Sequence, residues 1–151
     1  MSFEKWQSLV EQLGERFSFL PTEQDYQSFD IFIDNVNFEF IYGGPVDEDS
    51  LYVNCEYGSL PEMYDAEIIE LLLETNLVNF GNHGPVYAID RLTKSVIQMF
   101  RFSVSDTPID KIHTIMTQAA FQANIWRYTY FLPLQKAENI EEKLKEEMQN
   151  N

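Results

Sequence analysis

The sequence predicts an α+β domain: a twisted antiparallel sheet of about five strands with three helices, in the order helix, three strands, helix, two strands, helix. Three observations support this prediction. Several short segments alternate apolar and polar residues, as strands with one buried face do. Longer segments repeat apolar residues every three or four positions, as amphipathic helices do. Strands and helices are grouped and do not alternate, which favours α+β over a doubly wound parallel sheet.

The first helix is predicted over residues 2–19, with Ser2 as its N-cap and Pro21 as its stop. Its apolar stripe consists of Phe3, Trp6, Val10, Leu13 and Phe17. Three alternating strands are predicted next, over residues 28–34, 37–42 and 51–57. One face of these strands is apolar, so one side of the sheet is expected to pack on the core and the other to stay accessible.

The accessible face is not wholly polar, because Phe32, Ile41 and Tyr52 interrupt it. Three interpretations remain open for these three side chains. The first helix covers them, they are simply exposed surface residues, or they form a surface that binds another molecule.

The second helix, over residues 62–76, is apolar around most of its circumference. Such a helix is expected to be buried on two sides. The sheet of the same chain covers one side, so a second copy is expected to cover the other. We therefore predict a homodimer with this helix and the 86–102 hairpin near the two-fold axis. The predicted interface residues are Ile68, Ile69, Leu72, Leu73, Val86, Ile97 and Met99.

The 86–102 hairpin supplies the last two strands, and a third helix begins between Asp106 and Pro108. Its stripe ends near Trp126, and Pro133 is expected to stop it. The chain is thus divided into a domain over residues 1–132 and a charged tail or short helix over residues 133–151.

Acidic residues outnumber basic ones by 25 to 10, which gives a formal net charge of −15. Residues 17–90 contain 15 of these acidic residues and no Lys or Arg. Nucleic acid and anionic membrane surfaces are therefore disfavoured as partners. The acidity suits a basic or neutral protein partner, and it equally suits a domain that is simply kept soluble.

No residue pattern predicts catalysis, a metal site or a cofactor. Cys55 is the single cysteine, and neither His83 nor His113 has a zinc-site spacing. The first residues lack the pattern of a secretory signal, and no apolar run is long enough to span a membrane. We expect a cytoplasmic binding protein and not an enzyme.

Five short motifs stand in an order that resembles the class I chaperones of bacterial type III secretion, the family typified by the chaperone of the translocated intimin receptor. They are Gly58-Ser59-Leu60-Pro61, Leu71-Leu72-Leu73 with Asn76-Leu77, Gly84-Pro85-Val86, Ala88-Ile89-Asp90, and Trp126. The resemblance implies a homodimer that holds an extended N-terminal segment of an effector or translocator, which adds strands and fills hydrophobic patches without ATP.

On this interpretation Phe32, Ile41 and Tyr52, together with Phe3 and Trp6 of the first helix, are expected to contact the bound segment. An alternative class is an acidic immunity or inhibitor protein that neutralises a toxin by direct binding. The state of the partner separates the two classes, because a chaperone holds an unfolded segment and an inhibitor binds a folded enzyme.

Overall fold

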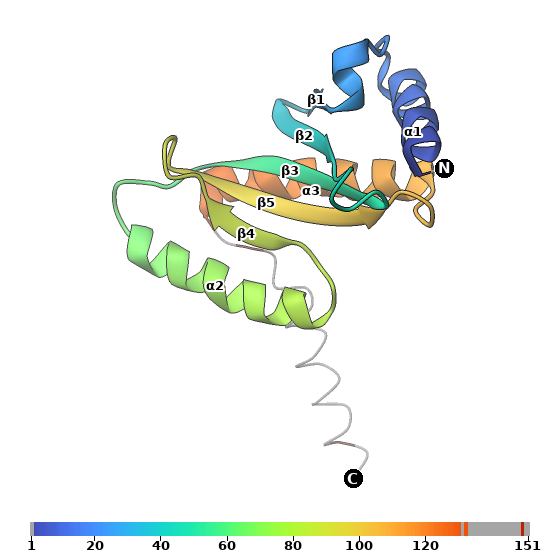
Figure 1. Cartoon of the computed structure of the whole chain (residues 1–151). Coiled ribbons are helices and arrows are strands. Elements are labelled where there is room, and N and C mark those ends of the chain that lie inside the picture. The colour runs from blue at the N-terminus through green and yellow to red at the C-terminus, as the bar shows by residue number, and fades with distance from the viewer. Residues whose placement is uncertain (1, 131, 133–148, 150–151) are drawn as a thin grey trace.

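The computed structural model describes residues 2–130, 132 and 149 (Figure 1). Its elements confirm the predicted α+β order. They are α1 (Ser2–Phe17), a 3-10 turn η1 (Glu23–Tyr26), β1 (Ser28–Ile33), β2 (Val36–Tyr42), β3 (Ser50–Ser59), α2 (Asp65–Gly81), β4 (Val86–Ile89), β5 (Ser95–Ser103) and α3 (Ile109–Thr129).

The five strands form one antiparallel sheet in the order β1-β2-β3-β5-β4. Helix α3 lies across one face of this sheet, and α1 lies beside the end that β1 and β2 form (Figure 1). Helix α2 lies alongside β4, at the opposite edge. The core between the sheet and the helices is rich in large side chains, among them Trp6, Phe38, Phe40, Leu51, Tyr57, Met116 and Trp126.

Helix α1 packs on the same face of the sheet as α3. The Trp6 ring stacks on Tyr42 at 5.1 Å and on Phe29 at 6.1 Å, and Phe29 points into the core. The interpretation that the first helix covers the other face is therefore wrong. That face, called the open face below, has no helix over it in the described part of the chain, and Phe32 on it is 71% exposed.

The second helix begins later and ends later than predicted, at Asp65 and Gly81 instead of residues 62 and 76. Asn76 was expected to end it, because Asn is frequent at helix ends. Its side chain instead leaves the middle of the helix and hydrogen-bonds the backbone of Tyr87 in β4. The apolar sequence after Asn76 continues the helix to the glycine.

The other two helices end earlier than predicted. Helix α1 ends at Phe17, because Ser18 adopts a left-handed conformation with φ 62°. Helix α3 ends at Thr129, before Pro133, because Tyr130 has φ 57° and its N–H donates to the Trp126 carbonyl at 2.7 Å. The predicted tail over residues 133–151 lies outside the described residues except for Gln149.

Candidate functional site

The described residues offer no obvious chemistry. No group of three His, Cys, Asp or Glu side chains among them is placed to hold a metal ion. Cys55 is buried, and burial raises the pKa of its thiol to about 12, which keeps it protonated and unreactive. None of the described helices has the length and apolar character needed to cross a bilayer. The candidate sites described below are hollows and exposed apolar groups on the surface.

One hollow lies where β1 begins, β2 ends and α1 starts, and we call it the end pocket. Its volume is about 670 Å³. Its lining residues are Phe3, Tyr26, Gln27, Ser28, Ile41, Tyr42, Gly44, Pro45 and Glu48. The end pocket thus brings together Phe3 and Ile41, two of the residues predicted to contact a bound segment.

Aromatic stacking fixes the wall of the end pocket. Phe3 contacts Tyr42 with ring centroids 6.0 Å apart, and Trp6 stacks on Tyr42 almost in parallel. Trp6 itself is fully buried, and its indole N–H donates to the Tyr26 carbonyl at 2.8 Å. Trp6 was predicted to contact the bound segment, and its burial excludes this in the folded chain. It holds Tyr42 and Tyr26 in place from beneath.

The register of the sheet shows which open-face residues are neighbours. Ile41 lies directly opposite Tyr52, so these two predicted contact residues form one small apolar pair beside the end pocket. Phe32 lies opposite Asn37, further along β1. A polar row that begins with the cross-strand pair of Asp30 and Glu39 runs between Phe32 and the apolar pair. The three predicted residues therefore do not form one continuous patch.

The open face also carries an apolar group at its β4 edge, which we call the β4–β5 patch. Val86 lies opposite Met99, and Ala88 lies opposite Ile97. Three of the four side chains, those of Val86, Ile97 and Met99, were predicted from the sequence to lie at a dimer interface. The structure places them side by side on one surface.

The predicted interface residues of α2 divide into two groups. Ile68 and Leu72 are buried within the chain, so they face its own core and not a second copy. Ile69 is half-buried, and Leu73 is exposed. The large exposed apolar side chains on α2 form instead a stripe at helical spacing, Leu73, Leu77 and Phe80, which we call the α2 stripe.

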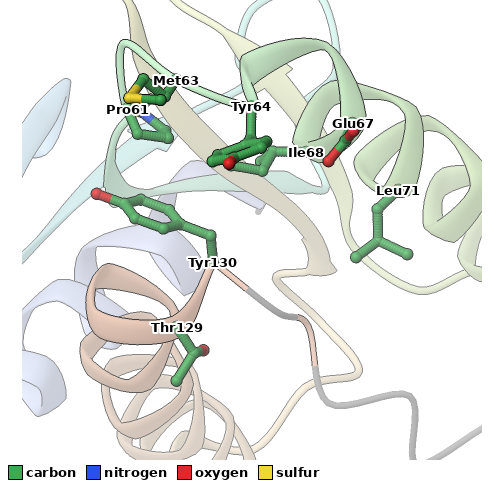
Figure 2. A pocket seen from close by; sticks show the side chains of 8 residues that line it. All are labelled: Pro61, Met63, Tyr64, Glu67, Ile68, Leu71, Thr129 and Tyr130. Atoms are coloured by element: carbon green, nitrogen blue, oxygen red, sulfur yellow. The ribbon is translucent and has the colours of Figure 1, made fainter.

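A second hollow, which we call the tyrosine pocket, has a volume of about 370 Å³ and lies between the first half of α2 and the end of α3. The rings of Tyr64 and Tyr130 both line this space, and Ile68 lies next to Tyr64 (Figure 2). Both tyrosines have positive φ, at 64° and 57°. No sequence pattern predicts this pocket, because its two walls are distant in the chain.

The acidic loop between β2 and β3 is tied to β5 by charged hydrogen bonds. Arg101 donates to the Asp47 carboxylate at 2.8 Å, and Ser103 donates to Asp49 at 2.6 Å. A hydrogen bond from Ser50 is the main cause that lowers the pKa of Asp47, and one from Ser103 does the same for Asp49. Both carboxylates are therefore ionised near neutral pH, in the same loop as Glu48 of the end pocket.

Comparison with known proteins identifies the fold. No family profile matches the chain, and no curated protein sequence does. Solved structures do match the chain, among them three that align over most of their own length. The ExsC–ExsE complex aligns with a TM-score of 0.64, 14% identity, and coverage of 83% of this chain and 92% of the other. The HopA1–SchA chaperone–effector complex aligns with a TM-score of 0.67, 15% identity, and coverage of 85% and 97%.

The third structure is the Yersinia pestis type III secretion chaperone SycH in complex with a stable fragment of YscM2. It aligns with a TM-score of 0.60, 16% identity, and coverage of 80% of this chain and 98% of the other. The chain therefore has the fold of the type III secretion chaperones, which confirms the resemblance seen in the sequence motifs.

Proposed function

We propose that this protein is a cytoplasmic type III secretion chaperone that binds an extended N-terminal segment of an effector or translocator and keeps it competent for secretion. The observation that carries the proposal is the shared fold, together with a binding surface of the right kind at the end of the sheet. The end pocket, with the apolar pair of Ile41 and Tyr52 beside it, offers a hollow and an apolar surface to the side chains of an extended peptide. No chemistry is needed for this role.

The charge of the protein suits the same role. Glu48 lines the end pocket, and Asp47 and Asp49 lie in the same acidic loop. A field of this sign attracts basic segments and mainly raises the rate of encounter. Added salt is therefore expected to slow association of the client more than it accelerates release.

The proposal includes a homodimer formed through the α2 stripe and the β4–β5 patch. Leu77 is 80% exposed and Phe80 is 77% exposed. Leaving such a side chain in water forgoes about 1.5–3 kcal/mol of burial energy. The substitution Leu77→Asp is expected to give a monomer in sedimentation experiments while the far-UV circular dichroism stays unchanged. A wild-type protein that sediments as a stable monomer at micromolar concentration contradicts the dimer.

The client-binding role is tested by affinity capture from the native host, followed by hydrogen exchange on the captured protein. Wild-type protein and Leu92→Asp are expected to capture the same client, since Leu92 is exposed in a hairpin turn remote from the end pocket. A variant with Phe3→Asp and Ile41→Asp is expected to lose the client and to keep its fold.

Replacing Phe32, Ile41 and Tyr52 by polar residues tests the open face in the same way. Capture is expected to fail while the protein still folds, because none of the three is in the core. Hydrogen exchange of the captured client decides between the two functional classes. Protection of an otherwise unfolded segment supports a chaperone. A client that is folded and globular where it meets this protein refutes the chaperone role and favours an inhibitor.

A further inference from the structure

The two edges of the sheet are not equivalent. At the β4 edge, Asn76 donates to the Tyr87 carbonyl at 2.9 Å and accepts the Tyr87 N–H at 2.6 Å. The Asp90 N–H donates to Ser95 in β5, so by the alternation of an antiparallel pair Tyr87 directs its backbone groups outward. The side chain of Asn76 therefore takes the place of a neighbouring strand at Tyr87, and α2 lies alongside this edge and closes it.

The β1 edge is open. The Tyr42 N–H donates to the Gln27 carbonyl, which shows which residues of β1 direct their backbone groups towards β2. Alternation then directs the backbone groups of Ser28, Asp30 and Phe32 away from β2. No strand covers these groups in the described part of the chain. Unpaired edges of this kind are templates for the addition of another strand.

The side chains at this edge give the added strand a chemical requirement. Asp30 lies directly opposite Glu39, and like charges in that position repel each other. Neither carboxylate has an ion-pair partner among the described residues. Arg101, also on the open face, is paired with Asp47. The row at the open edge thus carries two negative charges that no described residue compensates.

We propose that the client adds a strand to β1 and places Lys or Arg opposite Asp30, with an apolar residue two positions away on each side. One apolar residue then lies opposite the exposed Phe32. The other lies opposite Ser28, which lines the end pocket. The pattern apolar–x–basic–x–apolar reads the same in both directions, so it holds for a parallel and for an antiparallel strand. This inference rests on the proposed function and specifies the client that it accepts.

The same row disfavours self-association at this edge. Two copies of β1 that pair about a two-fold axis at Asp30 bring four carboxylates together, the Asp30 and Glu39 of each copy. A basic client strand relieves the repulsion that a second copy increases. The charge thus selects the client over the protein itself.

The test uses the full chain with a strand peptide fused to its N-terminus through a flexible Gly/Ser linker. Phe3 and Ser28 line the same pocket, so the N-terminus lies near the start of β1. A linker of about ten residues spans about 17 Å and supplies a high effective concentration. One fusion carries Leu-Thr-Lys-Thr-Leu, and the matched fusion carries Leu-Thr-Glu-Thr-Leu. The readout is amide exchange at Asp30 and Phe32, measured by NMR.

The Lys fusion is expected to protect both amides about three- to tenfold more than the Glu fusion. In Asp30→Lys the preference is expected to reverse. In Glu62→Lys, which makes the same change of charge at an exposed position between β3 and α2, the preference is expected to stay. If Asp30→Lys and Glu62→Lys behave alike, the selectivity is only that of net charge, and the inference is wrong.

Two further outcomes separate this inference from the function itself. If neither fusion protects the β1 amides, strand addition at this edge is refuted. The chaperone role is not refuted by that result if the captured client still protects amides around the end pocket from exchange. If no client binds at the end pocket either, the proposed function fails as well.

Discussion

From the two hydrogen bonds by which Asn76 closes the β4 edge, we predict how much stability the protein loses without them. Asn76→Ala removes two partly buried hydrogen bonds and leaves the N–H and C=O of Tyr87 to find other partners. Each such bond contributes about 0.5–1.5 kcal/mol net, so the variant is expected to lose about 1–3 kcal/mol of unfolding free energy. For a domain of this size that loss lowers Tm by about 3–10 °C.

The measurement is chemical and thermal unfolding followed by tryptophan fluorescence, since Trp6 and Trp126 are both fully buried. Wild type and variant are compared at one protein concentration, because association adds to apparent stability. Amide exchange gives the local readout, and the Tyr87 amide is expected to lose protection while amides in the middle of the sheet keep theirs.

Asn82→Ala is the matched control. The Asn82 side chain makes one exposed hydrogen bond, to the Val78 carbonyl at the end of the same helix. Its loss is expected to change stability by less than about 0.5 kcal/mol. If Asn76→Ala is as mild as this control, or if the Tyr87 amide keeps its protection, then Asn76 does not close the edge.

Three further predictions concern stability and reactivity. Gly58→Ala is expected to destabilise the fold by about 1–3 kcal/mol in denaturation experiments, because Gly58 has φ 148° and a Cβ there would lie 3.1 Å from the Trp126 ring. Gly81→Ala is the control. A Cβ at Gly81 meets open space, so this variant is expected to be neutral or stabilising. The pKa of Asp49 is lower in the folded than in the unfolded protein, so its carboxylate stabilises the fold at pH values above the unfolded pKa. This stabilisation is lost as the pH falls through the folded pKa. Asp49→Asn is therefore expected to flatten the acid limb of a stability–pH profile below about pH 4. Cys55 is expected to resist iodoacetamide at pH 8 until the protein unfolds, and rapid alkylation of the native protein would contradict its burial.

The fold was predictable because its signals are periodic. Alternation along β1, β2 and β3 and the stripe of α3 fix which elements form and which face each one buries. The end of α2 was not predictable from local signals. Asn76 is typical of a helix end, and only its contact with β4, eleven residues away in the chain, explains why the helix passes through it.

The candidate site was predictable in part. The sequence indicated Ile41, Tyr52 and Phe3, because apolar residues on a polar strand face and at a helix start are conspicuous. It assigned Trp6 to contact with the bound segment and Ile68 to a dimer interface, and both are buried within the chain. A stripe shows that a helix has an apolar face, but the packing partner decides which of its members lie deepest.

The difference between the two sheet edges has a consequence for solubility at high concentration. If both edges were open, β1 of one copy could pair with β4 of the next, and this head-to-tail contact would repeat without end and build a fibre. Asn76 removes one of the two surfaces that such growth requires. The pairing that remains, β1 against β1, brings the Asp30 and Glu39 carboxylates of both copies together and is disfavoured by their repulsion. The protein can therefore keep one strand edge available to a foreign chain without becoming a template for its own aggregation.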